Sequence, residues 1–364
     1  ASIASNVKTI YFDQFMALFP QMMDIYDKYS MYQNSIASDQ MPPAAIEANR
    51  SFIMAKSSII GLIRAFITKT TEVSNCRPCL PPIIQVIITN YGNSHPYTRT
   101  PEVLDLISDL FMKMRDDVSD QLPSILGGIF MPTYQMIETT GDIINDPDFS
   151  SFVNFRLPFF NLLRILVVNF FEQIITLDEG FQLIMQAIRF GYFHPVPDCC
   201  EKTLDTVMQL LKKIKNMAMS NQQIVTVFSE NYYLPLVEDM FRILTDTLHK
   251  FAFDKNIELL AYLLQMQVTE LNPQNVALSI IPLFQDKDQQ QIYEFVCALI
   301  AKSNNTRDFK QLIKDFLVFT RTFKLRDPDL DRENLDHMNQ ENQQYLEQQV
   351  LDHNDGAEGN FEFV

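Results

Sequence analysis

Glycine is scarce in this chain, at 9 of 364 residues, against an average usage of about 7%. Few positions can therefore adopt the left-handed backbone conformation that β-hairpins, bulges and phosphate-binding loops need. The sequence has no G-x-G-x-x-G motif and no P-loop, and the pair Gly127-Gly128 is followed by apolar residues. We interpret that pair as a close helix contact or a kink. The composition favours an all-α protein.

Signatures of catalysis are also missing. There is no G-x-S-x-G elbow, and the five histidines are scattered along the chain. A catalytic nucleophile needs an oriented base beside it, and the order of residues suggests no such pair. We expect neither enzyme activity nor a bound cofactor.

Basic residues are outnumbered, with 29 Lys and Arg against 45 Asp and Glu and a formal net charge of −16. Nucleic acid is thereby disfavoured as the main ligand, because phosphate binding needs a dense basic surface. The most apolar run, residues 157–177, is long enough to span a bilayer but contains Arg164 near its centre. That arginine alone would cost about 2.5–3.5 kcal/mol on insertion. We expect a buried helix and no membrane insertion.

The five cysteines permit two interpretations. Cys76 and Cys79 have the C-x-x-C spacing of zinc and redox sites, and Cys199-Cys200 would be needed to complete a tetrad. The two pairs are expected about 20 Å apart, at the ~10 Å spacing of packed helices. We therefore favour structural thiols, with Cys297 on an apolar helix face, over a metal or redox site.

Residues 80–104 have the pattern of two helices with a break between them. Pro81 and Pro82 suit the start of a helix, where a missing N–H costs nothing, and isoleucines then recur on one face. We expect a turn at Asn90–Asn93. A second helix should follow, capped by the hydroxyl of Thr100.

This hairpin resembles the C-terminal repeats of the exportin-1 family of karyopherins. The matching residues, in chain order, are Leu80-Pro81-Pro82, Asn90-Tyr91, Asn93, Pro96, Arg99, Pro101-Glu102-Val103-Leu104, Asp148-Phe149, Arg156, Phe159-Phe160, Leu162-Leu163, Phe228, Tyr232-Tyr233, Phe241, Thr245-Asp246-Thr247, Phe309-Lys310 and Asp315-Phe316-Leu317-Val318. Because they are collinear from about Tyr11 to about Phe323, the resemblance covers most of the chain.

Hydrophobic periodicity predicts about seven helical hairpins. The expected helices are 9–34 with 46–72, 80–92 with 101–118, 122–142 with 148–176, 179–192 with 198–218, 223–248 with 253–270, 274–285 with 287–303, and 307–324 with a long last helix at 329–352. Unequal hairpins of this kind are typical of HEAT repeats, which stack into an α-solenoid because each buries its neighbour's apolar face. We expect a right-handed superhelix with three parts: a repeat array (1–325), a regulatory C-terminal helix (326–352) and an acidic, flexible tail (353–364).

The first residues, ASIASNV, include no initiator Met and no capping repeat. A solenoid that started there would expose an apolar end. We expect a fragment or a processed chain, which under the resemblance would be the C-terminal third of a longer receptor.

The resemblance implies a nuclear export receptor that carries cargo with leucine-rich export signals through nuclear pores together with Ran-GTP. Its partners would be Ran-GTP, cargo and nucleoporins, and it would shuttle between nucleus and cytoplasm. In this family the cargo groove lies in repeats upstream of the region resembled, so no residue of this chain is assigned to it.

Residues 326–364 hold eleven acidic residues against two arginines. They could form a solvated, disordered end, or a weakly docked helix that detaches. The second interpretation rests on a thin apolar stripe formed by Leu330, Leu335, Met338, Tyr345, Leu346 and Val350. The resemblance implies a regulatory role, because in the family the last helix and tail oppose cargo binding until Ran-GTP arrives.

Lys212, Lys213 and Lys215 form the best candidate surface for an acidic partner, with Glu201 and Asp205 one to three turns earlier on the same helix. A solubilising helix face is the alternative. The resemblance implies Ran contacts on the concave side of the third to fifth hairpins. Two rival classes remain: another helical-repeat scaffold or karyopherin with a different partner, and an enzyme or metal protein built around the cysteines.

Overall fold

The computed structural model describes residues 8–37, 43–138, 152–177, 179–217, 220–266, 272–284 and 287–320. All regular secondary structure in these ranges is helical. The chain divides into two compact units, Ala1–Asn216 and Met217–Val364. An all-α fold of stacked helical hairpins is confirmed in each unit.

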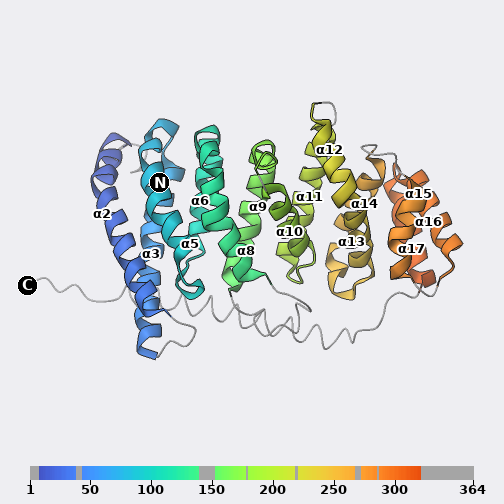
Figure 1. Ribbon diagram of the computed structural model, residues 1–364, viewed down its shortest axis with the longest axis horizontal. Helices are drawn as coiled ribbons and strands as arrows, with labels where there is room; N and C mark the ends of the chain where they lie inside the picture. Colours follow the sequence, from blue (N-terminus) through green and yellow to red (C-terminus); the bar gives the residue numbers. More distant parts are fainter. Residues whose placement is uncertain are drawn as a thin grey trace, which may run out of the picture. The chain divides into compact units, whose positions relative to one another are not determined.

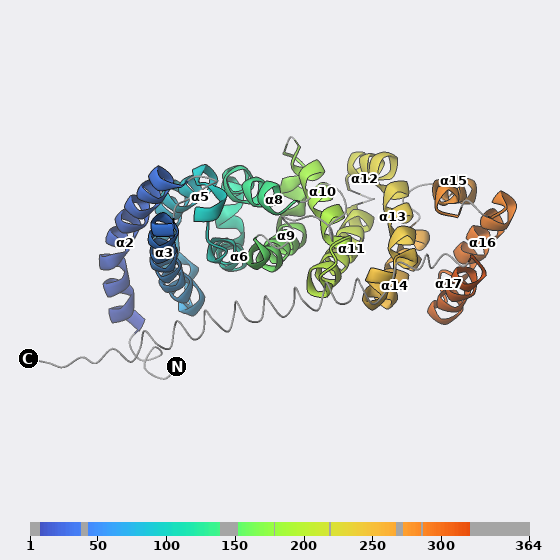
Figure 2. The ribbon, with the colours of Figure 1, turned by 90° about the horizontal axis from the view of Figure 1, so that it is seen from below.

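Two rows of helices form the first unit (Figures 1 and 2). The first row is α2 (Lys8–Ile36), the rod α4–η3–α5 (Leu80–Pro82, Ile83–Ile88, Thr89–Asn93), the rod α7–η6–α8 (Leu122–Ile125, Leu126–Phe130, Met131–Ile137) and α10 (Gly180–Tyr192). The second row is α3 (Pro43–Lys69), α6 (Glu102–Met114), α9 (Val153–Ile174) and α11 (Pro197–Met217). Helices pack against their neighbours along each row, as α3 does with α6 and α6 with α9. Four hairpins result, in the predicted order.

Short 3-10 segments connect these helices. They are η1 (Val73–Asn75), η2 (Arg77–Cys79), η4 (Pro96–Thr98) and η5 (Arg115–Gln121). The core is rich in phenylalanine: Phe111 on α6 lies 4.6 Å from Phe170 on α9, and Phe130 on η6 lies 4.6 Å from Phe159 on α9, centroid to centroid. These four rings are nearly inaccessible to solvent, so burial of aromatic surface stabilises the joint between the second and third hairpins and the interior of the third.

The second unit begins with one rod made of α12 (Gln222–Phe228), η7 (Ser229–Tyr233) and α13 (Leu234–Thr245). Then follow η8 (Thr247–Ala252), α14 (Phe253–Gln265), α15 (Pro273–Ile280), η9 (Ile281–Leu283), α16 (Gln289–Lys302) and α17 (Thr306–Thr320). Helix α15 pairs with α16, as predicted. Helix α17 packs against α14 as well as α16, and so joins α15 and α16 in a three-helix group. Its predicted partner at 329–352 lies outside the described residues.

Within the described residues, two rods of the first unit and one rod of the second contain a π-helical segment, which the periodicity did not predict. Pro132 and Pro235 each lie two residues after such a segment, η6 and η7. A proline inside a helix has no N–H to donate and clashes with the carbonyl four residues earlier. Local widening to π geometry accommodates that clash without ending the rod.

The hairpin at 80–104 differs from its prediction in two details. The turn expected at Asn90–Asn93 is helical, because α5 continues to Asn93 and the chain leaves the helix at Ser94. Thr100 does not cap α6 with its side chain: its hydroxyl is buried without a hydrogen-bond partner, and only its carbonyl accepts from the Val103 N–H at 3.3 Å. The segment packs against the third hairpin, where Nη1 of Arg99 donates to the carbonyl of Pro132 at 2.7 Å.

That packing depends on a close contact between two helices. A Cβ atom on Gly92 would lie 2.9 Å from the carbonyl oxygen of Gly128, and one on Gly128 would lie 2.6 Å from Cγ2 of Ile88. By contrast, a Cβ on Gly127 would meet nothing within 4 Å. The expected close helix contact is therefore confirmed at Gly128, while Gly127 lines an open groove of about 340 Å³ beside it.

Candidate partner-binding surface

All five candidate partner residues lie on α11, the last helix of the fourth hairpin. Glu201, Asp205, Lys212 and Lys215 follow one another at steps of four, seven and three residues, which return to the same side of an α-helix. Asp205, Lys212 and Lys215 are exposed, whereas Glu201 is half-buried. Lys213 lies next to this stripe and is half-buried too. The opposite face of α11 is apolar and packs into the core.

The helix separates the two acids from the three lysines. Asp205 and Lys212 are seven residues apart, or about 10 Å along the helix axis. The acids lie in the N-terminal half of the helix and the lysines in its last two turns, the order that the helix dipole favours. The lysines alone form a compact positive cluster, and we call Lys212, Lys213 and Lys215 the α11 lysine cluster.

One contact that the sequence did not predict joins α11 to α9. The amine of Lys202 on α11 donates to Oδ1 of Asn161 on α9 at 2.5 Å. The two residues are 41 positions apart, so this bond is a tertiary feature.

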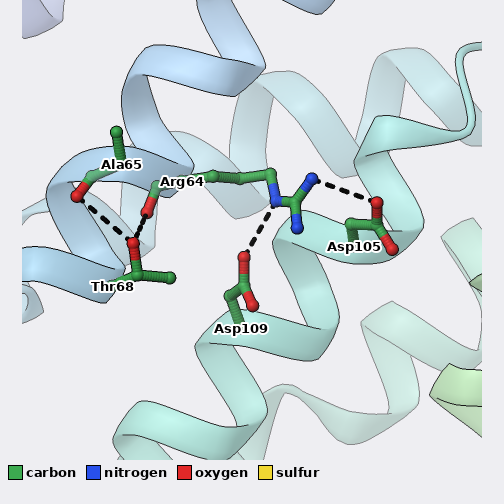
Figure 3. A network of polar contacts seen from close by, with 5 residues as sticks. All are labelled: Arg64, Ala65, Thr68, Asp105 and Asp109. Carbon is green, nitrogen blue, oxygen red and sulfur yellow. Dashed lines mark hydrogen bonds and ion pairs between the residues drawn. The ribbon is translucent and has the colours of Figure 1, made fainter.

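A second charged group on the same row joins the first hairpin to the second (Figure 3). Arg64 on α3 donates from Nε to Asp109 at 2.8 Å and from Nη1 to Asp105 at 3.0 Å, both on α6. Burial raises the pKa of Asp105; the charge of Arg64 opposes that shift and the charge of Asp109 adds to it. One guanidinium thus holds together two carboxylates that would otherwise repel each other one helical turn apart.

Substituting Arg64 by Met is expected to lower the free energy of unfolding by about 1–2 kcal/mol at pH 7, because two partly buried carboxylates would lose their counter-charge. The loss should shrink at pH 4.5, where Asp105 becomes protonated more readily in the folded protein than in the unfolded chain. Urea denaturation at both pH values measures the effect. The matched control is R77M, which breaks the exposed Arg77–Asp117 pair and should cost under about 0.5 kcal/mol. Equal losses in the two variants would contradict this account.

The cysteines are packing residues. Cys76, Cys79, Cys199 and Cys200 are buried free thiols, and Cys297 is half-buried. The Cys200 thiol donates to the carbonyl of Tyr192 at 3.2 Å. Burial raises the pKa of Cys79 and of Cys199 to about 12, so neither is a ready thiolate. Among the described residues there is no group of three or more His, Cys, Asp and Glu side chains that could hold a metal ion.

Two helical segments in the described part of the chain are long and apolar enough to cross a membrane, Asn49–Lys69 and Val153–Ile174. The first belongs to α3, which packs against α2 and α6, and the second is α9, which packs against α6, α8 and α10. This position between other helices accounts for their apolar character. Both are core helices of the array.

The first unit consists of stacked helical hairpins in two rows, and the second row carries charged side chains at its surface. These features define a helical-repeat scaffold protein. The particular family follows from comparison with known proteins. Residues 14–325 match the family model described as CRM1 C terminal. The chain belongs to this family.

Curated relatives carry the exportin name. The chain is 25% identical over 349 residues to Protein EXPORTIN 1B of Arabidopsis thaliana, with 89% of this chain and 31% of the relative covered. It is 24% identical over 342 residues to Exportin-1 of Schizosaccharomyces pombe and over 345 residues to Exportin-1 of Dictyostelium discoideum, each with 88% of this chain and 31% of the relative covered. The chain thus spans about a third of the length of these relatives.

Proposed function

We propose that this chain forms the C-terminal part of a nuclear export receptor. The observation that carries the proposal is the match to the CRM1 C-terminal family over residues 14–325, and the exportin names of the relatives agree with it. The chain's contribution is a helical scaffold and binding surfaces, with no enzymatic step. The receptor would shuttle between nucleus and cytoplasm and meet nucleoporins in the pore.

Within that receptor, the α11 lysine cluster would form part of the surface that meets Ran-GTP. Three lysines within four residues at an exposed helix end attract an acidic patch on a partner. Export-signal cargo would bind elsewhere, in repeats outside this chain. The alternative is a different helical-repeat scaffold whose partner is neither Ran nor an export signal.

A pull-down of the intact receptor tests the proposal. Export-signal peptide and GTP-locked Ran should each strengthen the binding of the other by the same factor, because coupling between two sites is reciprocal. Binding of each ligand without any effect of the other would contradict an export receptor. Binding of neither would favour the alternative scaffold.

Residues 326–364, which lie outside the described ranges, would act as an inhibitory element. A helix held by a thin apolar stripe would make only a few contacts, so a partner could release it. Deleting 326–364 from the intact receptor is expected to tighten the binding of an export-signal peptide in the absence of Ran. Fluorescence anisotropy with a labelled peptide measures the change, and an unchanged affinity would remove the inhibitory role.

A further inference from the structure

A buried lysine lies where the first hairpin meets the second. Lys56 on α3 is 2% exposed. Its amine donates to Oε1 of Gln33 on α2 at 2.8 Å and to the carbonyl of Thr98 in η4 at 3.1 Å. It also lies 5.2 Å from the centre of the Tyr26 ring. One amine thereby joins α2 and α3 of the first hairpin to the turn of the second.

Two more buried side chains extend this polar contact. Gln33 donates from Nε2 to Oδ1 of Asn49 at 2.7 Å, and Asn49 donates from Nδ2 to the carbonyl of Tyr97 at 3.0 Å. The carbonyls of residues 97 and 98 are therefore both held by side chains of α3. We call Gln33, Asn49 and Lys56 the polar clamp of this joint.

The charge of Lys56 has no carboxylate partner among the described residues. The amine of Lys56 faces the Tyr26 ring on α2, and Tyr91 on α5 and Glu102 on α6 in turn act electrostatically on Tyr26. Its own hydrogen-bond acceptors are neutral. Burial, with no opposing charge, lowers the pKa of Lys56 to about 8 from 10.5.

Other groups at this joint would also gain from contact with water. The hydroxyls of Ser30 and Thr100 and one carboxylate oxygen of Glu102 are buried without a hydrogen-bond partner. Ser30 is one turn from Tyr26 on α2, Glu102 is the first residue of α6, and Thr100 lies two residues before it. Opening the joint would hydrate all three, which lowers the cost of opening.

We propose that the joint between the first hairpin (α2 and α3) and the second (α4–η3–α5 and α6) is a proton-linked hinge, with Lys56 as the group that binds the proton when the hinge opens. At pH 7 the closed joint buries a charged amine, and opening relieves that cost. At pH 9 the closed joint holds a neutral amine, which can still donate to Gln33 and Thr98. When the joint opens at pH 9, the amine of Lys56 must therefore bind a proton.

The sign and size of the effect follow from the pKa of Lys56 in the closed joint and its pKa in the open joint. A group that is more basic in the open state than in the closed state makes opening less favourable as pH rises. With values of about 8 in the closed joint and 10.5 in the open one, protection against opening should rise about tenfold between pH 7 and pH 9. Tyr26 and Tyr91 do not titrate in this window, because burial raises the pKa of each above its ordinary value.

Hydrogen exchange of the full chain, followed by mass spectrometry at pH 7.0 and 9.0 and corrected for intrinsic exchange, tests the hinge. Peptides covering 26–34 and 96–104 should gain about tenfold protection at the higher pH, and peptides covering 159–171 should not. Both K56M and K56R should abolish the gain, the first because no titratable group remains and the second because arginine stays charged. K113M is the control: it removes a lysine that donates to the carbonyl of Thr70 in the same unit and should retain the gain.

Two results would overturn the proposal. One is the full gain in a folded K56M or K56R protein, and the other is an equal gain at 159–171. If K56M fails to fold, K56R decides alone, because it keeps the positive charge at the joint.

Discussion

Replacing Gly128 by alanine is expected to lower the free energy of unfolding by about 2–3 kcal/mol, whereas alanine at Gly127 should leave it unchanged or raise it by up to ~1 kcal/mol. The new methyl at 128 would lie 2.6 Å from Cγ2 of Ile88. Ile88 is buried and β-branched, so it has no free rotamer to move into. The same methyl at 127 would point into open space and would only gain helix propensity.

Gly92 lies on the other helix of this contact, and its substitution gives an independent check. Alanine at Gly92 would bring a methyl within 2.9 Å of the Gly128 carbonyl, and a backbone atom cannot move without shifting its helix. We expect G92A to cost as much as G128A. The double variant should cost less than the sum, because either methyl alone already forces the two rods apart.

Thermal unfolding of the full chain followed by circular dichroism measures these differences. In a unit of about 200 residues, 1 kcal/mol corresponds to about 2–4 °C, so G92A and G128A should each unfold about 5–10 °C lower, with G127A at or above the parent chain. A G127A protein as unstable as G128A would show that the glycine pair serves helix bending and not the contact with the second hairpin.

The glycine pair illustrates what the sequence could and could not predict about the fold. Scarcity of glycine and the spacing of apolar residues predicted helices, their order and their approximate ends, because these depend on local periodicity. The sequence could not distinguish Gly127 from Gly128, since their difference depends on which neighbouring rod each one faces. The same limit explains the turn expected at Asn90–Asn93: Asn, Gly and Asn are turn residues by preference, yet here Gly92 is required by the contact with Gly128 inside a continuing helix.

The prolines show a similar limit to what the sequence can predict. Pro81 and Pro82 were correctly placed at a helix start, where the ring is tolerated. Pro132 and Pro235 lie inside rods that pass through them by way of π-helical segments. Whether a proline ends a helix or only widens it depends on the packing that holds both sides in line, and that information is tertiary.

The candidate surface was predictable only in part. The α11 lysine cluster is contiguous in sequence, so its place on one helix end followed from the helix prediction. The pairing of Lys202 with Asn161, the fork of Arg64 to α6 and the polar clamp around Lys56 each join residues more than 20 positions apart. No local pattern indicates such contacts. By its sequence pattern, Lys56 is an ordinary polar position of α3. Only the tertiary structure shows that its amine contacts the carbonyl of Thr98.

Reversing two charges of the α11 lysine cluster is expected to weaken binding of GTP-locked Ran to the intact receptor by about 30- to 100-fold at low salt. Lys212 and Lys215 are exposed on one stripe of α11, so K212E/K215E would turn an attractive end of the helix into a repulsive one. About 1–1.4 kcal/mol for each reversed charge gives this range. The loss should fall as salt is raised from 50 to 300 mM, because exposed charges are screened.

The control must change the net charge equally without touching this surface. K28E/K69E reverses two exposed lysines of the first hairpin, on α2 and α3, and Lys28 pairs with the exposed Asp24 of its own helix. It should weaken Ran binding by less than about threefold, since distant charges contribute mainly through the long-range field. Both double variants should unfold within about 0.5 kcal/mol of the parent, so loss of binding cannot come from loss of fold. Equal Ran affinity in K212E/K215E and the parent would leave α11 a solubilising face, and the search for the contact would move to Arg164 and Lys202.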